Sequence, residues 1–535
     1  EQINRLAGRE VAIAHHCDSK TKLSDIAAYP VVVITHRFYE IALDQLGQGA
    51  SIEATWPFIH EWANGTRKLI VIDECIDIVE HSTGSLMGLR QTRAVIPPDI
   101  EEDFQEEVMA LEALIELLTD VDQQKRKEGS KRETMVAHSA LMDDPPDLAA
   151  LRESMWKQVR YDLIVLKRSD PKELDRMRRQ HDARLKSVHA ILRSWAYYAK
   201  SKDVPTLNTA RLLVPEGVKG AVILDATASS NVLLDIWEDA RIETPYSNVR
   251  NYGNVALNYS TGHKVGKVFM VQNAKRLCRD LIADLNSRFS QDDKVLIVTH
   301  KDVEPVLMTH KADFQMMTAH WGAIDGSNEW KDCNKVVVFG LPYRPSTWSA
   351  NLFMSFQGPV STAWLQAEGK RPHGRHADIR RALMEGAIVV DVIQAINRVR
   401  CRKVIDEQGN CDPTSVWMLL PNDQLCDTLL DSIRRDMPGV HLHEWDYHGQ
   451  RRKTQKPRRG KFEESLTKFL VNMDPGSKPA VHIRHTLGMS ARKLSELTKK
   501  AQDQESDLHK TLSSLRVRYE VQRQGKTQRG VFIKD

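Results

Sequence analysis

Aliphatic runs that end in polar residues recur along the chain, and each run predicts a β-strand. The runs cover residues 31–34, 69–72, 221–224 and 295–298, and the residues that follow them are Thr35, Asp73, Asp225 and Thr299. Continuous apolar runs are typical of parallel strands that are buried on both faces. The pattern therefore predicts an α/β fold with polar residues at the carboxyl edge of the sheet, where the ligands of such sheets bind.

A helical period replaces the strand pattern between about residues 99 and 205. Its first stretch has apolar residues at Phe104, Val108, Leu111, Leu114, Ile115 and Leu118. That spacing places them on one face of a helix. Residues 120–146 are polar and charged and predict a mobile connection, whereas residues 148–200 again predict helices. We expect a helical insertion at about 99–205 within a first α/β domain of residues 1–245.

Residues 246–448 repeat the α/β pattern and predict a second domain. An amphipathic stretch at 277–289 predicts a helix, and residues 294–300 and 336–340 predict strands. A basic stretch at 449–460, which contains Pro and Gly, predicts a flexible linker.

The last part of the chain, residues 461–535, has the proportions of a winged helix. Short helices are predicted at 462–470 and 483–488, and a third helix is capped by Ser490. A hairpin is predicted for 518–534, with Gly525 and Lys526 at its turn. Such a unit can bind nucleic acid through a recognition helix, here with Arg492 and Lys493, and a basic wing, or it can bind protein.

From the distribution of charge we expect this end of the chain to bind a polyanion. Residues 449–535 hold 21 Lys and Arg against 9 Asp and Glu, a net charge of +12, whereas the whole chain carries only +4. A basic region of this kind favours a nucleic-acid partner. No apolar run approaches the roughly 20 residues that span a bilayer. The seven cysteines form no C-x-x-C pair, so reduced thiols and a cytoplasmic setting are expected.

The strongest chemical signal is the acidic pair Asp73 and Glu74, directly after an aliphatic run. In nucleotide hydrolases an aspartate at such a strand end holds Mg²⁺, and a neighbouring glutamate orients and deprotonates the attacking water. Strands also end in acidic residues for no catalytic reason. What favours catalysis is a series of further motifs in a fixed order.

In this order the motifs resemble those of superfamily 2 helicases of the DEAD/DEAH-like, DinG-related type. The matching stretches are Thr35-His36, Asp73-Glu74, Asp225-Ala226-Thr227-Ala228, Thr299-His300, Gly326-Ser327-Asn328 and Gln394 to Arg402. The string from Gly326 to Cys333 is similar to one in helicases of phages, plasmids and mobile elements. The resemblance covers about residues 31–402 and implies two RecA-like P-loop NTPase domains, Mg²⁺–ATP between them and nucleic acid across them.

The resemblance also implies roles for individual residues. Asp73 would hold Mg²⁺ and Glu74 the water, while Gln394 and one of Arg398, Arg400 and Arg402 would sense the γ-phosphate. The residues implied in nucleic-acid contact are Thr35, His36, Thr227, Thr299, His300, Gly326, Ser327 and Asn328. On a continuing helix, Gln394, Asn397, Arg398 and Cys401 would share a face.

Three features depart from the family pattern. No G-x-x-x-x-G-K-[ST] loop precedes residue 31, and Gly525-Lys526-Thr527 has Glu520 where the first Gly belongs. Asn397 replaces a Gly, and Cys401 stands where an Arg is expected, which leaves the arginine finger open. Only Cys17 precedes Cys75, so we expect no iron–sulfur cluster, unlike in the DinG/XPD branch.

We therefore expect an ATP-dependent DNA helicase or translocase, the C-terminal part of a larger replication or mobile-element protein. Its expected partners are single-stranded or forked DNA and a primase or replication protein, with no membrane; the motifs do not separate DNA from RNA. Two alternatives are a catalytically inert nucleic-acid-binding module on a RecA scaffold and a winged-helix regulator.

Overall fold

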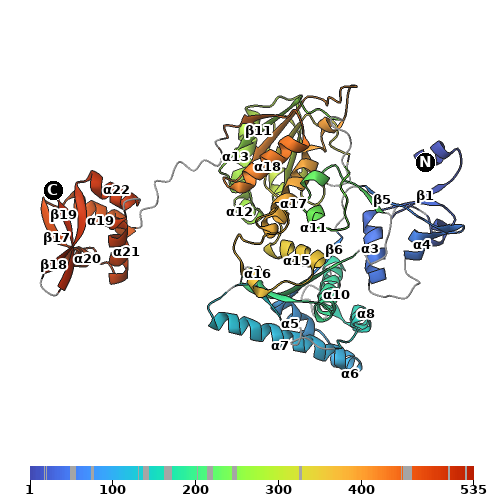
Figure 1. Cartoon of the computed structure of the whole chain (residues 1–535), viewed down its shortest axis with the longest axis horizontal. Coiled ribbons are helices and arrows are strands. Elements are labelled where there is room, and N and C mark those ends of the chain that lie inside the picture. Colours follow the sequence, from blue (N-terminus) through green and yellow to red (C-terminus); the bar gives the residue numbers. More distant parts are fainter. Residues whose placement is uncertain are drawn as a thin grey trace. The chain divides into compact units, whose positions relative to one another are not determined.

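The computed structural model divides the chain into two compact units, Glu1–Asp446 and Tyr447–Asp535 (Figure 1). The structure describes every residue except 17, 18, 20, 48–55, 74–77, 131, 137–143, 162–170, 202, 214–220, 244–249, 325–327, 448, 450–460, 504, 505, 525 and 526. The predicted linker at 449–460 lies outside the described residues apart from Gly449.

The N-terminal part contains two separate pairs of parallel strands. β1 (Ala12–His15) pairs with β2 (Val31–Ile34), and β5 (Ile70–Asp73) pairs with β10 (Ala221–Leu224). The short β3 (Glu61–Trp62) and β4 (Gly65–Thr66) form an antiparallel hairpin. The helices of this part are α1 (Gln2–Ala7), α2 (Leu23–Ile26), α3 (His36–Gly47) and α4 (Trp56–His60).

These N-terminal strands are covered on one face, so the prediction of burial on both faces is wrong for them. Ile72 of β5 is buried in a cluster with Tyr39 and Leu43 of α3 and Ile59 of α4. Its neighbour Val71 points the other way and is 55% exposed. Strand side chains alternate between faces, so an aliphatic run leaves every second residue exposed when helices pack on one face only.

The interval predicted as a helical insertion, about 99–205, also contains two complete strands, which corrects that prediction. They join two strands that lie mostly outside the interval in a four-stranded antiparallel sheet. The strand order is β6-β9-β8-β7, with β6 at Val79–Ser85, β7 at Thr134–Met135, β8 at Tyr197–Ser201 and β9 at Val204–Leu212. The helices are α5 (Leu86–Ala94), α6 (Pro98–Asp103), α7 (Gln105–Lys127), α8 (Ala149–Gln158) and α10 (Pro171–Leu192).

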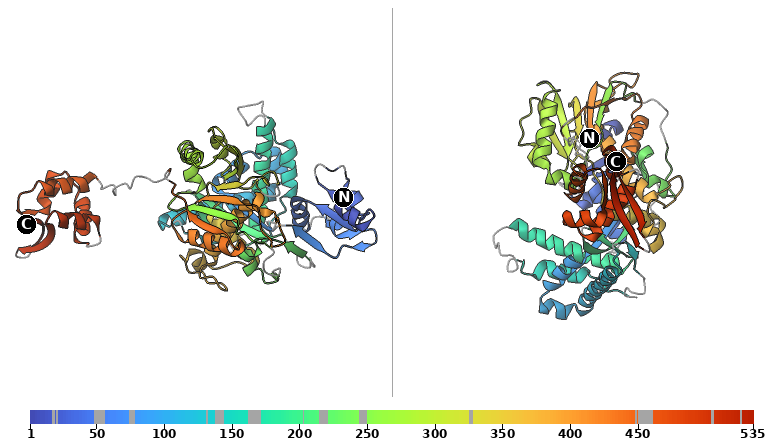
Figure 2. Two further views of the ribbon diagram at one scale, coloured as in Figure 1. Left: turned by 90° about the horizontal axis from the view of Figure 1, so that it is seen from above. Right: turned by 90° about the vertical axis from the view of Figure 1, so that its left-hand side faces the viewer.

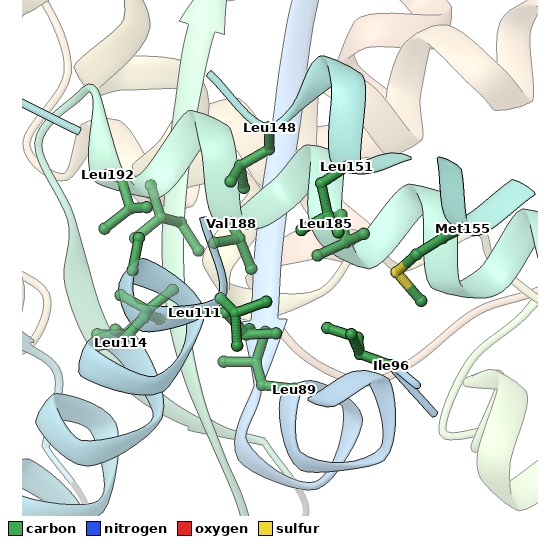
Figure 3. Close-up of a cluster of buried hydrophobic side chains, with 14 of the residues drawn as sticks. Leu89, Ile96, Leu111, Leu114, Leu148, Leu151, Met155, Leu185, Val188 and Leu192 are labelled. Carbon is green, nitrogen blue, oxygen red and sulfur yellow. The ribbon is translucent and has the colours of Figure 1, made fainter. Parts of the chain in front are cut away.

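A leucine-rich core holds these helices together (Figure 3). Leu185 and Val188 of α10 meet Leu111 of α7 and Leu89 of α5, and all four side chains are fully buried. The predicted apolar face of residues 104–118 is therefore confirmed. The connection predicted from residue 120 is wrong at its start, because α7 continues to Lys127.

Residues 255–444 form a six-stranded, wholly parallel sheet, which confirms the predicted α/β architecture for this part. The strand order is β13-β12-β14-β15-β11-β16, with β11 at Val255–Ser260, β12 at Lys294–Thr299, β13 at Gln315–His320, β14 at Lys335–Val338, β15 at Thr414–Leu419 and β16 at His441–Glu444. The apolar residues of β12 are fully buried, as expected for a strand covered on both faces.

Helices and short turns connect these strands and β10. They are η2 (Ala228–Ser230), α11 (Leu233–Ile236), α12 (Lys267–Gln272), α13 (Ala274–Asn286), α14 (Glu304–Leu307), α15 (Ser346–Gln357), α16 (Thr362–Gln366), α17 (Ile379–Ile396), η3 (Arg400–Arg402) and α18 (Gln424–Asp436). The helix predicted at 277–289 corresponds to α13.

The C-terminal unit has its own core and a three-stranded antiparallel sheet (Figure 2, red). Its elements are α19 (Lys461–Val471), β17 (Gly476–Pro479), α20 (Ala480–Thr486), α21 (Ala491–Gln502), α22 (Asp507–Ser514), β18 (Val517–Gln524) and β19 (Thr527–Lys534), and the strand order is β17-β19-β18. The predicted hairpin and the Ser490 cap, which accepts from the Lys493 backbone N–H, are confirmed. β17 and α22 were not predicted.

Candidate nucleotide and nucleic-acid site

Asp73 stands at the carboxyl end of β5, beside the loop that follows β10. The two strands run parallel with Asp73 in register with Leu224, so Asp225 leaves the sheet at the same edge. The Asp73 side chain is exposed, so its carboxylate is accessible to a metal ion that arrives from solvent. Glu74 lies outside the described residues.

Asp225 organises the loop after β10. Its Oδ1 accepts hydrogen bonds from the Thr227 backbone N–H at 2.7 Å and from Thr227 Oγ1 at 2.6 Å, and its Oδ2 accepts from Asn231 Nδ2 at 3.4 Å. Aspartate commonly closes turns in this way. Thr227 is 1% exposed, so its hydroxyl serves the turn in this conformation. The same bonds give a structural reason for Asp225, where the resembling family usually has Ser.

The loop is tied to the end of α18 by a serine–aspartate contact. Ser229 Oγ donates to Asp436 Oδ1 at 2.8 Å, and Ser230 also donates to the Asp436 carboxylate. Arg435 donates to Ser230 Oγ at 2.6 Å. This contact could not be predicted from the sequence, because its partners lie more than two hundred residues apart and belong to no motif.

Thr299 and His300 are packed at the carboxyl end of β12. Thr299 is fully buried and donates to the Phe339 carbonyl at 2.7 Å. His300 is 5% exposed, its Nε2 lies 3.3 Å from the Val265 carbonyl, and burial lowers its pKa. Gly340, with φ near +110°, passes so close that a Cβ there would lie 2.9 Å from His300 Nε2. Neither predicted side chain offers a free surface to nucleic acid in this conformation.

A polar pair that sequence reasoning missed lies at the next strand end. His320, the last residue of β13, has its Nδ1 2.6 Å from Glu304 Oε2 of α14. Both side chains are half-buried. β13 reads Gln-Met-Met-Thr-Ala-His and lacks the aliphatic run that singled out Thr299, so the same pattern did not reveal His320.

The structure brings two of the predicted motifs together through Asn328 and Arg402. Arg402 donates to Asn328 Oδ1 at 2.6 Å; Asn328 is exposed and Arg402 is half-buried. Lys403 pairs with Asp332 at 3.0 Å beside this contact. The Asn328–Arg402 contact therefore forms a polar surface where the two motifs meet. Gly326 and Ser327 lie outside the described residues.

The shared helical face predicted for Gln394 to Cys401 is wrong, because α17 ends at Ile396. Asn397 closes the helix: its Nδ2 donates to the Ile393 carbonyl at 2.9 Å, and its Oδ1 accepts from the Tyr252 hydroxyl. Gln394 is half-buried on the last turn of α17, and Arg398 is 5% exposed beyond it. Arg400 donates to the Pro413 carbonyl at 2.6 Å. The choice of an arginine finger stays a prediction.

The other predicted contact residues lie on the surface. Thr35 caps α3, because its Oγ1 accepts from the Phe38 backbone N–H at 3.2 Å, and His36 is the exposed first residue of that helix. Arg492 is exposed at the start of α21, whereas Lys493 is half-buried and pairs with Glu496 at 2.8 Å.

Two features are absent from the described part of the chain. None of the helices there is both long and apolar enough to cross a lipid bilayer. No three His, Cys, Asp or Glu side chains of that part of the chain gather as a metal-binding group.

Comparison with known proteins gives distant structural neighbours. No protein-family model and no curated protein matches the sequence. The S. tokodaii Xpd4 structure is similar to the chain with 13% sequence identity and a TM-score of 0.37, over 83% of this chain and 87% of that one. A structure described as "XPD_Helicase" is similar with 12% identity and a TM-score of 0.37, over 82% and 80%. These neighbours are XPD-type helicases, and at this TM-score the likeness supports no further argument.

Proposed function

We propose that the chain is an ATP-dependent helicase or translocase acting on single-stranded nucleic acid, DNA foremost. The supporting observation is the parallel pairing of β5 with β10, which sets Asp73 at the same sheet edge as the loop organised by Asp225. Carboxylates at such an edge are suited to phosphate and metal chemistry.

The Asp73 carboxylate fits a Mg²⁺ that arrives with a nucleotide. Mg²⁺ keeps several waters and is commonly bound by one or two carboxylates together with substrate phosphates, so it needs no cage of protein ligands. Asp73 is exposed and free to serve in this way. When bound, the metal neutralises charge on the transferring phosphoryl group. Glu74 would then orient the attacking water.

The loop after β10 offers a route from nucleotide to nucleic acid. Its serines bond Asp436 at the end of α18, and α18 packs on α17, which carries Gln394. Hydrogen bonds and helix packing therefore connect the loop after β10 to α17. The Asn328–Arg402 contact would face the nucleic-acid backbone.

The C-terminal unit would bind nucleic acid as a winged helix. Its order of three helices between β17 and β18, followed by a hairpin, supports a helix-turn-helix with a wing. The helix directly before the hairpin is α22, and Ser506 caps it by accepting from the His509 backbone N–H. We therefore assign recognition to α22 together with exposed Arg492 of α21.

ATP hydrolysis with and without single-stranded DNA tests the proposal. We expect DNA to stimulate hydrolysis, and Asp73→Asn to abolish it while DNA binding stays. Asp99→Asn, at an exposed aspartate outside the site, is the matched control and should hydrolyse ATP normally. If neither the unaltered chain nor Asp99→Asn hydrolyses ATP although both bind DNA, the motor is refuted and the inert binding module is left.

A sequence-specific regulator is the second candidate, because Tyr447–Asp535 is a separate compact unit with its own core. Selection of bound duplexes from a random pool distinguishes the two. A motor that tracks the backbone gives no consensus and steep salt dependence. A regulator gives a defined site whose selection is lost in Lys510→Gln, at an exposed position of α22.

A further inference from the structure

A polar hollow of about 310 Å³ lies between α10 and the β6–β9 pair, away from every motif described above. Two cross-strand pairs form its floor: Glu80 opposite Arg211 and Ser82 opposite Thr209. Its wall is lined by Lys186 and His189 of α10 and by Arg193, which directly follows the end of that helix. The leucine-rich core takes other residues of α10, among them Leu185 and Val188 (Figure 3).

The floor of the hollow holds two hydroxyl groups that have no hydrogen-bond partner among the described residues. Ser82 lines the hollow and is 5% exposed, and no described residue hydrogen-bonds to its side chain. Thr209 is 2% exposed, and its Oγ1 lacks a partner among the described residues. A fully buried hydroxyl without a partner, such as that of Thr209, costs about 1–3 kcal/mol, and native structures seldom leave one. The Thr209 hydroxyl, with the solvent-accessible Ser82 hydroxyl on the opposite strand, therefore indicates a bound group.

The charge around the hydroxyls selects the sign of that group. Glu80 bridges Lys186 at 2.8 Å and Arg211 at 2.7 Å, so one carboxylate faces two cations. Arg193 adds a third cation and donates to the Pro145 carbonyl at 3.0 Å. The exposed Asp147 opposes this positive charge; its Oδ1 lies 3.7 Å from His189 Nδ1.

Burial and charged neighbours both act on the histidine of the wall. Burial lowers the pKa of His189, and the nearby Arg193 lowers it further, while Asp147 acts in the opposite direction. Three cationic groups against two carboxylates leave a net positive hollow whose floor is formed by hydroxyl donors. That combination is complementary to a compact oxyanion.

We propose that this hollow binds a phosphate group. Ser82 would donate from the floor, and Lys186 and Arg193 would donate from the wall, with Thr209 joining after rotation of its hydroxyl. The phosphate can be free or can belong to a nucleic-acid backbone. If it belongs to nucleic acid, the site deepens the proposed function by adding a contact on the inserted β6–β9 region.

Titration of the whole chain with inorganic phosphate, followed by calorimetry at constant ionic strength, tests the proposal. We expect saturable binding that falls about tenfold in Ser82→Ala and in Arg193→Gln, since each loses about one charge-assisted hydrogen bond. Arg179→Gln is the matched control: it removes the same charge from an exposed position of α10, where Arg179 pairs with Asp175. It should bind phosphate like the unaltered chain.

Lack of saturable binding, or equal affinity in Arg193→Gln and Arg179→Gln, overturns the proposal. The melting temperature of Ser82→Ala reveals whether lost binding reflects lost folding, and the exposed Arg193 supplies a variant that is free of this concern. The assay needs no ATP hydrolysis, so failure of the motor leaves its outcome unchanged.

A thymidine oligonucleotide distinguishes the two sources of phosphate. If the backbone is the ligand, the oligonucleotide competes with inorganic phosphate, and Arg193→Gln weakens its binding while Arg179→Gln does not. If free phosphate is the ligand, both variants bind the oligonucleotide alike and phosphate does not displace it.

Discussion

At the scale of single residues, Arg67 holds the N-terminal part together. Its guanidinium donates to five backbone carbonyls at 2.5–3.0 Å, those of Ile26, Tyr29, Phe58, Ile59 and Glu61. Four of these carbonyls belong to α2, the turn after α2 and α4, where helix ends leave acceptors unsatisfied, and the fifth belongs to the first residue of β3. Burial lowers the pKa of Arg67, but the carbonyl cluster favours its charged form.

Replacing Arg67 should therefore loosen the segment from α2 to β4. We expect Arg67→Met to lower its local stability by about 2–3 kcal/mol, since hydrogen bonds to a charged group are lost and carbonyls are left unpaired. Hydrogen exchange of residues 23–66 measures this. Arg37→Met, at a side chain 78% exposed in the same part, should leave exchange unchanged. Equal protection in both variants would contradict the role of Arg67.

Single residues also show which features the sequence reveals. Ser490 was predicted as a helix cap and is one, because a cap depends on residues three positions apart. Asn397 ends α17 for an equally local reason, yet the family pattern favoured a longer helix there. The Asp436–Ser229 contact had no local signal. Local chemistry is readable from sequence, whereas contacts between distant segments depend on the completed fold.

At the scale of elements, a buried carboxylate fastens α7 to β8. Asp122 is 3% exposed and accepts from Tyr198 Oη at 2.8 Å, Lys200 Nζ at 3.2 Å and Arg126 Nε at 2.7 Å. Burial alone would raise the pKa of the Asp122 carboxyl. The three hydrogen bonds outweigh burial and hold that pKa below its ordinary value.

The stability that Asp122 contributes should depend on pH. Because its pKa is lower in the folded than in the unfolded chain, where it is about 3.9, the contribution is complete above roughly pH 4 and is lost as the pH falls through the folded value. Asp122→Asn should therefore destabilise the chain at neutral pH and progressively less in acid, measured by denaturant midpoints. Asp120→Asn, at an exposed position of the same helix, should show no such trend. A gap between wild type and Asp122→Asn that is constant with pH would refute the assignment.

An ion pair joins α17 to the segment before β7. Arg380 binds Glu133 through two contacts of 2.5 and 3.1 Å and donates to the Ser346 carbonyl at 2.8 Å. Both charged side chains are largely buried. The pair therefore links the inserted sheet to the second α/β part.

Breaking this pair on one side should be costly. Arg380→Met leaves the Glu133 charge buried without its partner, and we expect a loss of about 3–5 kcal/mol in unfolding free energy. The double variant Arg380→Met with Glu133→Gln should recover part of that loss. Arg381→Met, the exposed neighbour that pairs with Glu385 within the helix, should change stability by less than about 1 kcal/mol. A double variant no more stable than Arg380→Met would show that the ion pair is not the cause.

The inserted sheet was missed because its strands lack the pattern that revealed the others. β6 reads Val-Glu-His-Ser-Thr-Gly-Ser, with no aliphatic run, and its partner β9 begins more than one hundred residues later. The local strand propensity of β6 is therefore weak, and its pairing with β9 stabilises the strand. The helices around it were predicted because their leucines repeat at a helical period that is visible in a short window.

At the scale of the whole molecule, strand burial follows the sequence in the second α/β part but not in the first. The two strands predicted there, β12 and β14, lie in one parallel sheet with four strands that were not predicted, and β12 is buried as its aliphatic run implies. The same type of run in β2, β5 and β10 belongs to isolated strand pairs in the described residues. A hydrophobic pattern indicates that a strand can be covered on both faces, but it does not indicate whether helices or strands cover both faces in the fold.

The half-covered strands should give the chain an accessible apolar surface. Val33 is 50% exposed, Val71 55% and Leu224 55%, and β2 and β5 line a common hollow of about 600 Å³. Apolar surface gathered in this way binds hydrophobic dyes, unlike scattered single residues. Val33→Thr with Val71→Thr should lower the fluorescence of such a dye while changing stability by about 0.5 kcal/mol or less, as exposed substitutions do. Val521→Thr, an equally exposed strand valine of the C-terminal unit, should leave the fluorescence unchanged. If the double variant also leaves it unchanged, these strand faces are covered in solution, and the isolation of the two strand pairs does not hold there.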